Sequence, residues 1–498
     1  MHFSETRSAV VLVLAMGVAC GPVFAADLDA SGDKPGFFGA SPILLAATEG
    51  GASPETTAGE SVSEGSKDPA LSSESSAVEA ASVAGMANVP VPGAEAASSV
   101  QQQSVTAGYE LGGWSLASQR RPTSGSILTA PAKGQPVRFE NGIAVHPAVL
   151  LGGGYNDNVT NRTNNKVSSS ILVLRPELVA ELRNQDNRYT LSYQGNYGHY
   201  ASSSDDDYQH HEVWAAGDNY LTSRTRIGWG VGYLERTDPR GSTDRVGAET
   251  PDRWHAPVVR ALGIYGAPGS IGRIELEGSS MQKRYDNNRT STVAYDVDLS
   301  TVSGRFFYRF MPKTSLLVEA RNTWANYKLS TSTADNTDLR LYAGIAWDVT
   351  AKTMGSIKLG RAYKKFDDAS REDSSMASWE GGLRWSPITY STFDLVTSRS
   401  PSEATGFGNF VLNSATTLVW SHRWASYFSS RVNAGYIKSE YDNTARTDHI
   451  TNYGVGVFRE LGRRMRAGVD WNFSERDSNQ VGFDFKRNVM MLTLEASL

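Results

Sequence analysis

The chain has 498 residues, 40% of them hydrophobic, and a formal net charge of −5. This weakly acidic balance excludes the strongly basic surface that nucleic-acid binding requires. A single cysteine, Cys20, leaves the rest of the chain without disulfides or cysteine metal sites, so the composition points to no cofactor.

The first 25 residues predict a secretory signal peptide. The run SAVVLVLAMGVA (8–19) has the length of an apolar h-region, and VFA (23–25) places small residues before a cleavage site between Ala25 and Ala26. An alternative interpretation cuts before Cys20 and acylates it, although the preceding residues lack the leucine typical of a lipobox. Both interpretations predict export.

Residues 26–137 are rich in Ser, Ala, Gly and Glu and poor in aromatic residues. Such a segment cannot bury enough apolar surface to offset its ordering entropy, so we expect it to be disordered. Within 51–100 it carries seven acidic residues and one lysine. The sequence predicts an acidic periplasmic tether, with a docking segment for a periplasmic or cell-wall partner as the alternative.

From residue 138 to the end, apolar and polar residues alternate in many short stretches. In MRAGVDWNFSER (465–476), for example, Met465, Val469 and Trp471 fall on one face of an extended chain, and Arg466 and Asp470 fall on the other. We count eighteen strand candidates at about 20 residues per strand and connection, which suits tilted membrane strands of about 9–11 residues. One stretch, 295–310, loses the alternation midway and predicts a bulge.

Short connections alternate with long polar ones along these strands. RNQDNR (183–188) and LTSRT (221–225) are short, whereas 156–169 and 237–252 are long. Outer-membrane barrels typically have short turns on the periplasmic side and long loops on the external side. A soluble sandwich, solenoid or propeller would also alternate, but it explains neither these lengths nor the signal peptide. We therefore predict an all-β fold, a closed antiparallel transmembrane β-barrel of about eighteen strands in the outer membrane of a Gram-negative bacterium.

Charged residues on the polar faces of these strands are predicted to line the pore. Both signs are mixed, which suits a neutral or weakly charged hydrophilic solute and gives no single-sign ring for strong ion selectivity; paired structural charges are the simpler alternative for any one residue. The predicted pore-lining residues are Arg175, Glu177, Glu181, Arg183, Arg188, Glu275, Glu277, Glu319, Arg321, Arg340, Asp348, Glu380, Arg384, Arg466, Asp470, Arg476 and Glu495.

Two other patterns could suggest chemistry. SDDDYQHHE (204–212) gathers carboxylates and imidazoles, but His210 and His211 point to opposite faces if extended, so we expect a solvated external loop rather than a metal site. His146 and His199 lack a serine and an acidic partner at any diagnostic spacing. We therefore predict no catalytic residues and no enzyme.

Three stretches resemble a known family: AVHPAVLLGGGYNDNVT, ILVLRPELVAELRNQDNRYTLSYQGNYGHYASSSDDDYQHHE and GYLERTDPRGS. They carry Tyr-Asn-Asp-Asn at the end of a first strand, Pro-Glu-Leu in a second and a Tyr-rich third. Over residues 140–498 the chain is similar to the type 2 family of outer-membrane β-barrel porins, often encoded among exopolysaccharide or capsule genes. The resemblance implies a passive outer-membrane conduit for a secreted polysaccharide and carries over no catalytic residues.

The first functional hypothesis is thus a conduit for a hydrophilic polymer, an exported exo- or capsular polysaccharide, working with a periplasmic polysaccharide-export system. A general diffusion porin for small hydrophilic solutes is the alternative, and a plugged structural or adhesive barrel is a third. The expected partners are outer-membrane lipid, lipopolysaccharide and the barrel-assembly machinery. We expect a monomer.

Overall fold

The computed structural model describes residues 136–241, 249–267, 270–350, 352–406 and 408–497. The predicted signal peptide, its cleavage site and almost all of the predicted tether lie outside the described residues. In the described part of the chain, no helix is long and apolar enough to cross a membrane.

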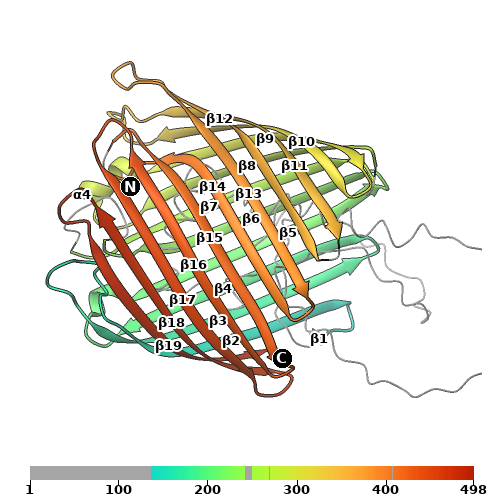
Figure 1. Ribbon diagram of the computed structural model, residues 1–498, viewed down its shortest axis with the longest axis horizontal. Helices are drawn as coiled ribbons and strands as arrows, with labels where there is room; N and C mark the ends of the chain where they lie inside the picture. The colour runs from blue at the N-terminus through green and yellow to red at the C-terminus, as the bar shows by residue number, and fades with distance from the viewer. Residues whose placement is uncertain (1–135, 242–248, 268–269, 351, 407, 498) are drawn as a thin grey trace, which may run out of the picture. The chain divides into compact units, whose positions relative to one another are not determined.

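Eighteen long strands and one short strand, β1 (Val137–Arg138), make up most of the described chain (Figure 1). Period-two alternation with many β-branched and aromatic residues favours this extended conformation. The long strands are β2 (Ile143–Asn156), β3 (Ser169–Asn184), β4 (Asn187–Tyr200), β5 (Tyr208–Thr222), β6 (Thr225–Asp238), β7 (Asp252–Tyr265), β8 (Gly272–Tyr285), β9 (Val297–Met311), β10 (Thr314–Tyr327), β11 (Asn336–Thr350), β12 (Thr353–Phe366), β13 (Ser374–Ile388), β14 (Ser391–Glu403), β15 (Phe410–Ala425), β16 (Phe428–Tyr441), β17 (Thr447–Glu460), β18 (Met465–Ser478) and β19 (Phe485–Ser497).

The sheet closes on itself. Each long strand pairs antiparallel with its neighbour in sequence, and β19 pairs with β2 from Val489↔Asn156 to Ser497↔Ala148. This confirms the predicted eighteen-stranded antiparallel barrel. The structure places the irregularity predicted within 295–310 at Phe310, beside the turn rather than midway, because Thr314 pairs with Met311 and Ser315 with Arg309, while β9 keeps one alternation from Val297 to Arg309. The alternation was obscured because the inward residues Val297 and Leu299 are apolar.

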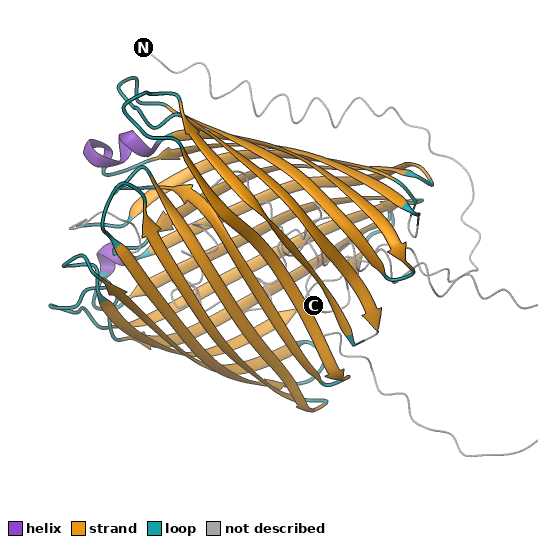
Figure 2. Ribbon diagram, turned by 45° about the horizontal axis from the view of Figure 1, so that its top comes forward, coloured by secondary structure: helices purple, strands orange, loops and turns teal. Residues whose placement is uncertain are grey.

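The two ends of the barrel differ in their connections (Figure 2). One end, here called the turn end, holds short turns such as those between β3 and β4 and between β9 and β10, together with Ile143 and Ser497 at the ends of the wall. The other, the loop end, holds the longer loops with the helical turns η2 (Ser204–Asp206), α4 (Arg289–Thr292) and η3 (Val293–Tyr295). Arg289 donates hydrogen bonds to Asp296, which raises the pKa of this guanidinium. By the general rule for outer-membrane barrels, the loop end faces outside.

The burial pattern is the reverse of that of a water-soluble protein. Large apolar side chains on the outer face are exposed, such as Leu492 at 63% and Leu359 at 61%, whereas the inner-face cations Arg487 and Lys358 are 0% exposed. Water-soluble monomers rarely expose such continuous apolar surface. An apolar band facing outward around a polar interior is what a bilayer requires of a spanning barrel.

Candidate functional site in the barrel interior

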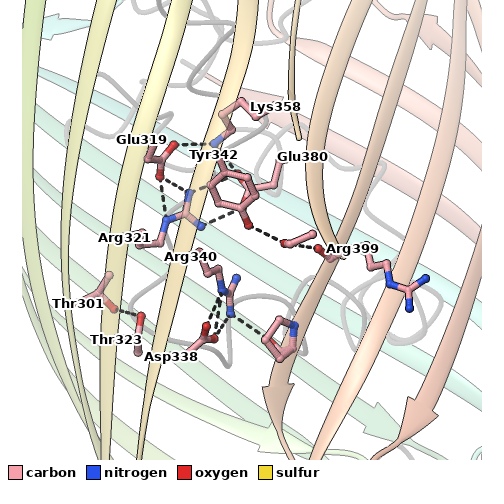
Figure 3. Close-up of polar contacts among 12 residues, drawn as sticks. Thr301, Glu319, Arg321, Thr323, Asp338, Arg340, Tyr342, Lys358, Glu380 and Arg399 are labelled. Atoms are coloured by element: carbon pink, nitrogen blue, oxygen red, sulfur yellow. Dashed lines mark hydrogen bonds and ion pairs between the residues drawn. The ribbon is translucent and has the colours of Figure 1, made fainter. Parts of the chain in front are cut away.

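A cluster of charged side chains lies on the inner face of β10–β13 (Figure 3). The Lys358 ammonium lies 2.7 Å from carboxylate oxygens of both Glu319 and Glu380. The Arg321 guanidinium bridges the same two carboxylates, at 2.6 Å from Glu319 and 2.9 Å from Glu380. The Tyr342 hydroxyl lies 2.8 Å from the hydroxyl of Ser378. Because all these groups are paired, their removal from bulk water is compensated.

A second cluster continues around the wall on β7–β9. Arg305 pairs with Glu275 at 3.0 Å and also with Glu277, while Arg260 pairs with Glu277 at 2.6 Å. Arg273 lies 3.0 Å from Glu275. The two clusters are contiguous, because Arg305 of β9 is the direct cross-strand partner of Glu319 on β10.

Together these nine residues form what we call the charged belt, which spans β7–β13. It consists of Arg260, Arg273, Glu275, Glu277, Arg305, Glu319, Arg321, Lys358 and Glu380. Five cations face four carboxylates, so the belt is nearly neutral. A mixed-sign lining of this kind hydrates polar solutes without strongly selecting cations or anions.

Predicted pore-lining residues outside the belt form smaller clusters. Arg175 donates to Asn196 at 3.0 Å, and Arg188 pairs with Glu181 at 2.8 Å. Arg183 also pairs with Glu181, but it lies at the turn end and its side chain is 60% exposed. Glu177 is buried on the same strand.

The other predicted residues lie on β11, β13 and β18–β19. Arg384 pairs with Asp394 at 2.7 Å, and Arg466 stacks 4.1 Å over the Phe458 ring. Asp470 is buried on β18 at 2% exposure, and Glu495 is the cross-strand partner of Arg466. Asp348 belongs to β11, but its side chain lies outside the described residues.

The wall is interrupted between β13 and β14. Their ladder ends at Trp379↔Arg399, so residues 374–378 of β13 have no ladder partner among the described residues of β14, whereas β14 and β15 stay paired up to Glu403↔Phe410. Residues 400–403 are buried consecutively rather than alternately. Consecutive burial means that both faces of this hairpin end are covered.

The contacts of Glu403 show where the hairpin end goes. By alternation Glu403 belongs to the outer face of β14, yet its carboxylate lies 2.5 Å from Nζ of Lys364 and accepts hydrogen bonds from Tyr327 and Asn336. These partners project from the inner faces of β12, β10 and β11. The hairpin end, residues 400–413, therefore lies inside the wall, and we call it the tucked hairpin.

Two further contacts hold the tucked hairpin. Arg340 pairs with Asp338 at 2.5 Å and donates to the backbone carbonyl of Pro401 at 2.9 Å (Figure 3). Phe410 packs in an apolar cluster with inner-face residues of β12 and β13, namely Ala362, Phe366 and Met376. A polar anchor and an apolar anchor thus fix this segment against the inner face of β10–β13, where it narrows the interior.

A loop reaches inward from the other side. Gly241, in the β6–β7 loop, has φ +70° and its carbonyl accepts a hydrogen bond from Arg476 of β18 at 2.9 Å. A Cβ there would lie 2.8 Å from Cβ of Asn161, so the close approach requires glycine. Asn161 donates to the carbonyl of Arg240 and accepts from Arg487. Arg240 and Gly241, in the described start of the β6–β7 loop, thus reach Asn161 and β18 at the loop end.

The aspartate and histidine stretch at 204–212 is divided among separate contacts. Asp206 pairs with Arg240, and Asp207 lies 2.7 Å from His199. His210 stacks on Tyr208, whereas His211 contacts the Tyr193 hydroxyl at 3.1 Å. Among the described residues, no group of three or more His, Cys, Asp or Glu side chains is arranged to hold a metal ion.

The sequence prediction missed several inner-face residues. Lys358 and Lys364 could have been found, because they alternate with Ile357, Leu359 and Tyr363 in one strand. Arg305 was missed because of the misplaced bulge. Nothing local identifies Glu403 as an inner residue, since its position depends on the path of the whole hairpin.

Comparison with known structures finds porins of pseudomonads. OccK11 (OpdR) of Pseudomonas aeruginosa is 14% identical over 71% of this chain and 96% of its own, with a TM-score of 0.39. OccK2 (OpdF) of the same organism is 12% identical over 73% and 100%, with a TM-score of 0.42. A BenF-like porin from Pseudomonas fluorescens Pf-5 is 12% identical over 71% and 99%, also with a TM-score of 0.42. No curated protein matches the chain.

The family comparison covers the entire barrel wall. The family model described as "Putative beta-barrel porin 2" matches residues 142–498, which begin one residue before β2 and reach the end of the chain. This agrees with the resemblance carried by the first three strands. It also agrees with the closed barrel described above, which has an apolar outer face and a polar interior. The chain therefore belongs to the beta-barrel porin 2 family of outer-membrane proteins.

Proposed function

We propose that this porin is a passive diffusion channel for small hydrophilic solutes. The observation that carries the proposal is the buried, nearly neutral charged belt inside a closed eighteen-stranded wall. Barrels of 16–18 strands are wide enough to hold an aqueous channel. Polar groups of both signs can replace the hydration of a passing solute without binding it tightly.

Two features favour small solutes over a polymer. The tucked hairpin lies inside the wall along β10–β13, and Gly241, just after β6, reaches Arg476 of β18. Both reduce the open cross-section of the barrel interior at the loop end. Passage of an exported polysaccharide, the first sequence hypothesis, stays a prediction that requires these segments to move aside.

Solute uptake by vesicles would test the proposal. Liposomes containing the refolded protein are expected to swell rapidly in a monosaccharide and progressively more slowly in longer oligosaccharides, because the constriction excludes bulky solutes. Equal rates for a monosaccharide and a long oligosaccharide would contradict the proposal and favour a polymer conduit. Absence of swelling from a correctly folded protein, verified by heat-modifiable gel mobility, would favour a plugged structural barrel.

The N-terminal segment provides a second test. We expect the same large single-channel conductance in planar bilayers with and without residues 26–135, because the belt and the hairpin are built by residues 252–413 alone. The measurement compares the two forms at equal salt and voltage. Closure that occurs only in the longer form would contradict free diffusion and make the segment a plug.

A further inference from the structure

The outer face of β12–β16 carries an unusual group of charges near the loop end. In this part of the described wall the outward charged residues are Arg361 and Lys365 of β12, Arg399 of β14, and Lys438 and Glu440 of β16. Four cations thus face one carboxylate on a surface that is otherwise apolar or hydroxyl-bearing. We call the four cations the basic rim.

The carboxylate does not neutralise the rim. Glu440 lies 2.8 Å from Nζ of Lys438 and 3.6 Å from Arg399. The exposed guanidinium of Arg361 donates only to the Ser375 hydroxyl, at 2.9 Å. In the loop above the rim, the carboxylates of Asp368 and Asp373 accept hydrogen bonds from the backbone N–H groups of Ser370 and Phe366. On the outer face of the strands themselves the rim therefore keeps an excess of positive charge, whereas the loop above it carries Asp367, Asp368, Glu372 and Asp373 against Arg371.

Hydrogen-bonding capacity at the rim is also unused. Arg399 and Ser414 face each other across β14 and β15, and Ser414 faces Lys438 across β15 and β16. Within the described structure, Nε of Arg399 and the hydroxyl of Ser414 have no hydrogen-bond partner. Both atoms are buried beside the rim, so the donors open to a ligand are those of the exposed cations themselves.

Three outward cations elsewhere at the loop end are matched by a neighbouring carboxylate. Arg284 and Lys328 both pair with Asp298, at 2.5 and 2.6 Å. Lys486 pairs with Glu475 at 2.8 Å. Outward charge by itself is therefore not unusual here, whereas uncompensated charge gathered over adjacent strands sets the basic rim apart.

The surface below the rim is suited to acyl chains. Toward the middle of the wall, the same strands expose Ile357 and Leu359 on β12, Leu418 on β15 and Tyr436 on β16. Residues 374–378 of β13 also have an unpaired edge at this level, where the tucked hairpin leaves the wall. An unpaired edge is costly in hydrocarbon but can be satisfied by polar headgroups. Cations above exposed apolar side chains complement an amphiphile with an anionic headgroup.

We propose that the basic rim binds the phosphorylated headgroup of lipid A, the lipid anchor of lipopolysaccharide, in the outer leaflet. Arg361, Lys365, Arg399 and Lys438 contact the phosphates, and the acyl chains lie along the apolar residues of β12, β15 and β16. Basic clusters beside a membrane bind anionic lipid through the same attraction, each cation adding to the affinity. The lipid also covers the β13 edge, so that it supports the wall where the hairpin leaves it.

Binding of purified lipid A to the full-length protein in neutral detergent would test this proposal. The double variant Arg361→Gln/Lys365→Gln removes two cations that have no carboxylate partner, and we expect it to bind lipid A roughly tenfold or more weakly than the parent. The matched control is Arg284→Gln/Lys486→Gln, which removes two cations paired elsewhere on the outer face and is expected to bind as the parent does. Native mass spectrometry would count the bound lipid in each case.

Binding measurements with three further ligands would distinguish lipid A from other anions. Phosphate-free lipid A, vesicles of phosphatidylglycerol and inorganic phosphate are each expected to bind more weakly than phosphorylated lipid A, because none combines its paired phosphates with several acyl chains. Equal loss of binding in the two double variants would overturn the proposal in favour of nonspecific attraction. Equal binding of phosphatidylglycerol would overturn the assignment to lipid A, as would unchanged binding by the rim variant.

Discussion

A Glu403→Ala variant is expected to show a several-fold larger single-channel conductance than the parent protein. The substitution removes the carboxylate that pairs with Lys364, which is 0% exposed, and that accepts from Tyr327 and Asn336. Leaving one member of a buried ion pair without its partner costs about 3–5 kcal/mol. We expect the tucked hairpin to move away from β10–β13 so that water reaches Lys364, and that movement would widen the interior. Planar-bilayer recording at fixed salt would measure the change.

Two controls separate hairpin release from general damage. Lys364→Met/Glu403→Leu replaces the pair by apolar side chains beside Phe366 and Phe410, so the hairpin should stay tucked and the conductance should remain close to that of the parent. A Ser402→Cys substitution adds a thiol at a position that is 0% exposed. This thiol should react slowly with a water-soluble maleimide in the parent and rapidly with Glu403→Ala. Parental conductance and slow labelling in a folded Glu403→Ala barrel would show that the carboxylate does not hold the hairpin.

Neutralising Lys358 should convert a weakly selective channel into a cation-selective one. In Lys358→Gln, Glu319 and Glu380 keep Arg321 as a shared partner but lose the ammonium that lies 2.7 Å from each. The belt then contains four cations and four carboxylates, and negative charge predominates within the β10–β13 cluster. Rings or patches of carboxylate favour cations in a narrow pore. We expect the potassium-to-chloride permeability ratio, measured from reversal potentials in a salt gradient, to rise several-fold.

Lys365 offers a matched control on the same strand. It lies seven residues from Lys358 but belongs to the outer face, so Lys365→Gln removes the same charge without changing the lining. Its reversal potential should equal that of the parent. A Glu380→Gln variant should shift the ratio in the opposite direction. Identical shifts for the two lysine variants would mean that the barrel's total charge, rather than the belt, sets the selectivity.

These two expectations concern different determinants of passage. The belt is expected to govern which charge is favoured, because it spans the inner face of seven of the eighteen long strands. The tucked hairpin governs how much cross-section is open, because it lies inside that wall. A belt variant should leave the conductance nearly unchanged, and a variant of the tucked hairpin should leave the ion selectivity nearly unchanged. The reason is that Glu403 and Lys358 have different ion-pair partners in the described structure.

The barrel wall of this protein could be predicted from local sequence patterns. Because side chains of a strand point alternately to opposite faces, the spacing within a stretch such as 465–476 is enough to divide its residues between lipid and lumen. In the structure Val469 and Trp471 are exposed on the outer face, while Arg466 and Asp470 are buried on the inner face. The number of strands and the two-sided connections followed from the same local information.

The narrowing of the interior could not be predicted in this way, because it depends on contacts between segments far apart in the sequence. Alternation places Glu403 on the outer face, where a carboxylate in the lipid layer would be destabilising, yet its partners Lys364, Tyr327 and Asn336 come from strands far away in sequence. The crossing of Gly241 to Arg476 is equally remote, at a sequence separation of 235. Strand periodicity is a local property of neighbouring residues, whereas the path of a hairpin or loop depends on which distant side chains it meets once the barrel has closed.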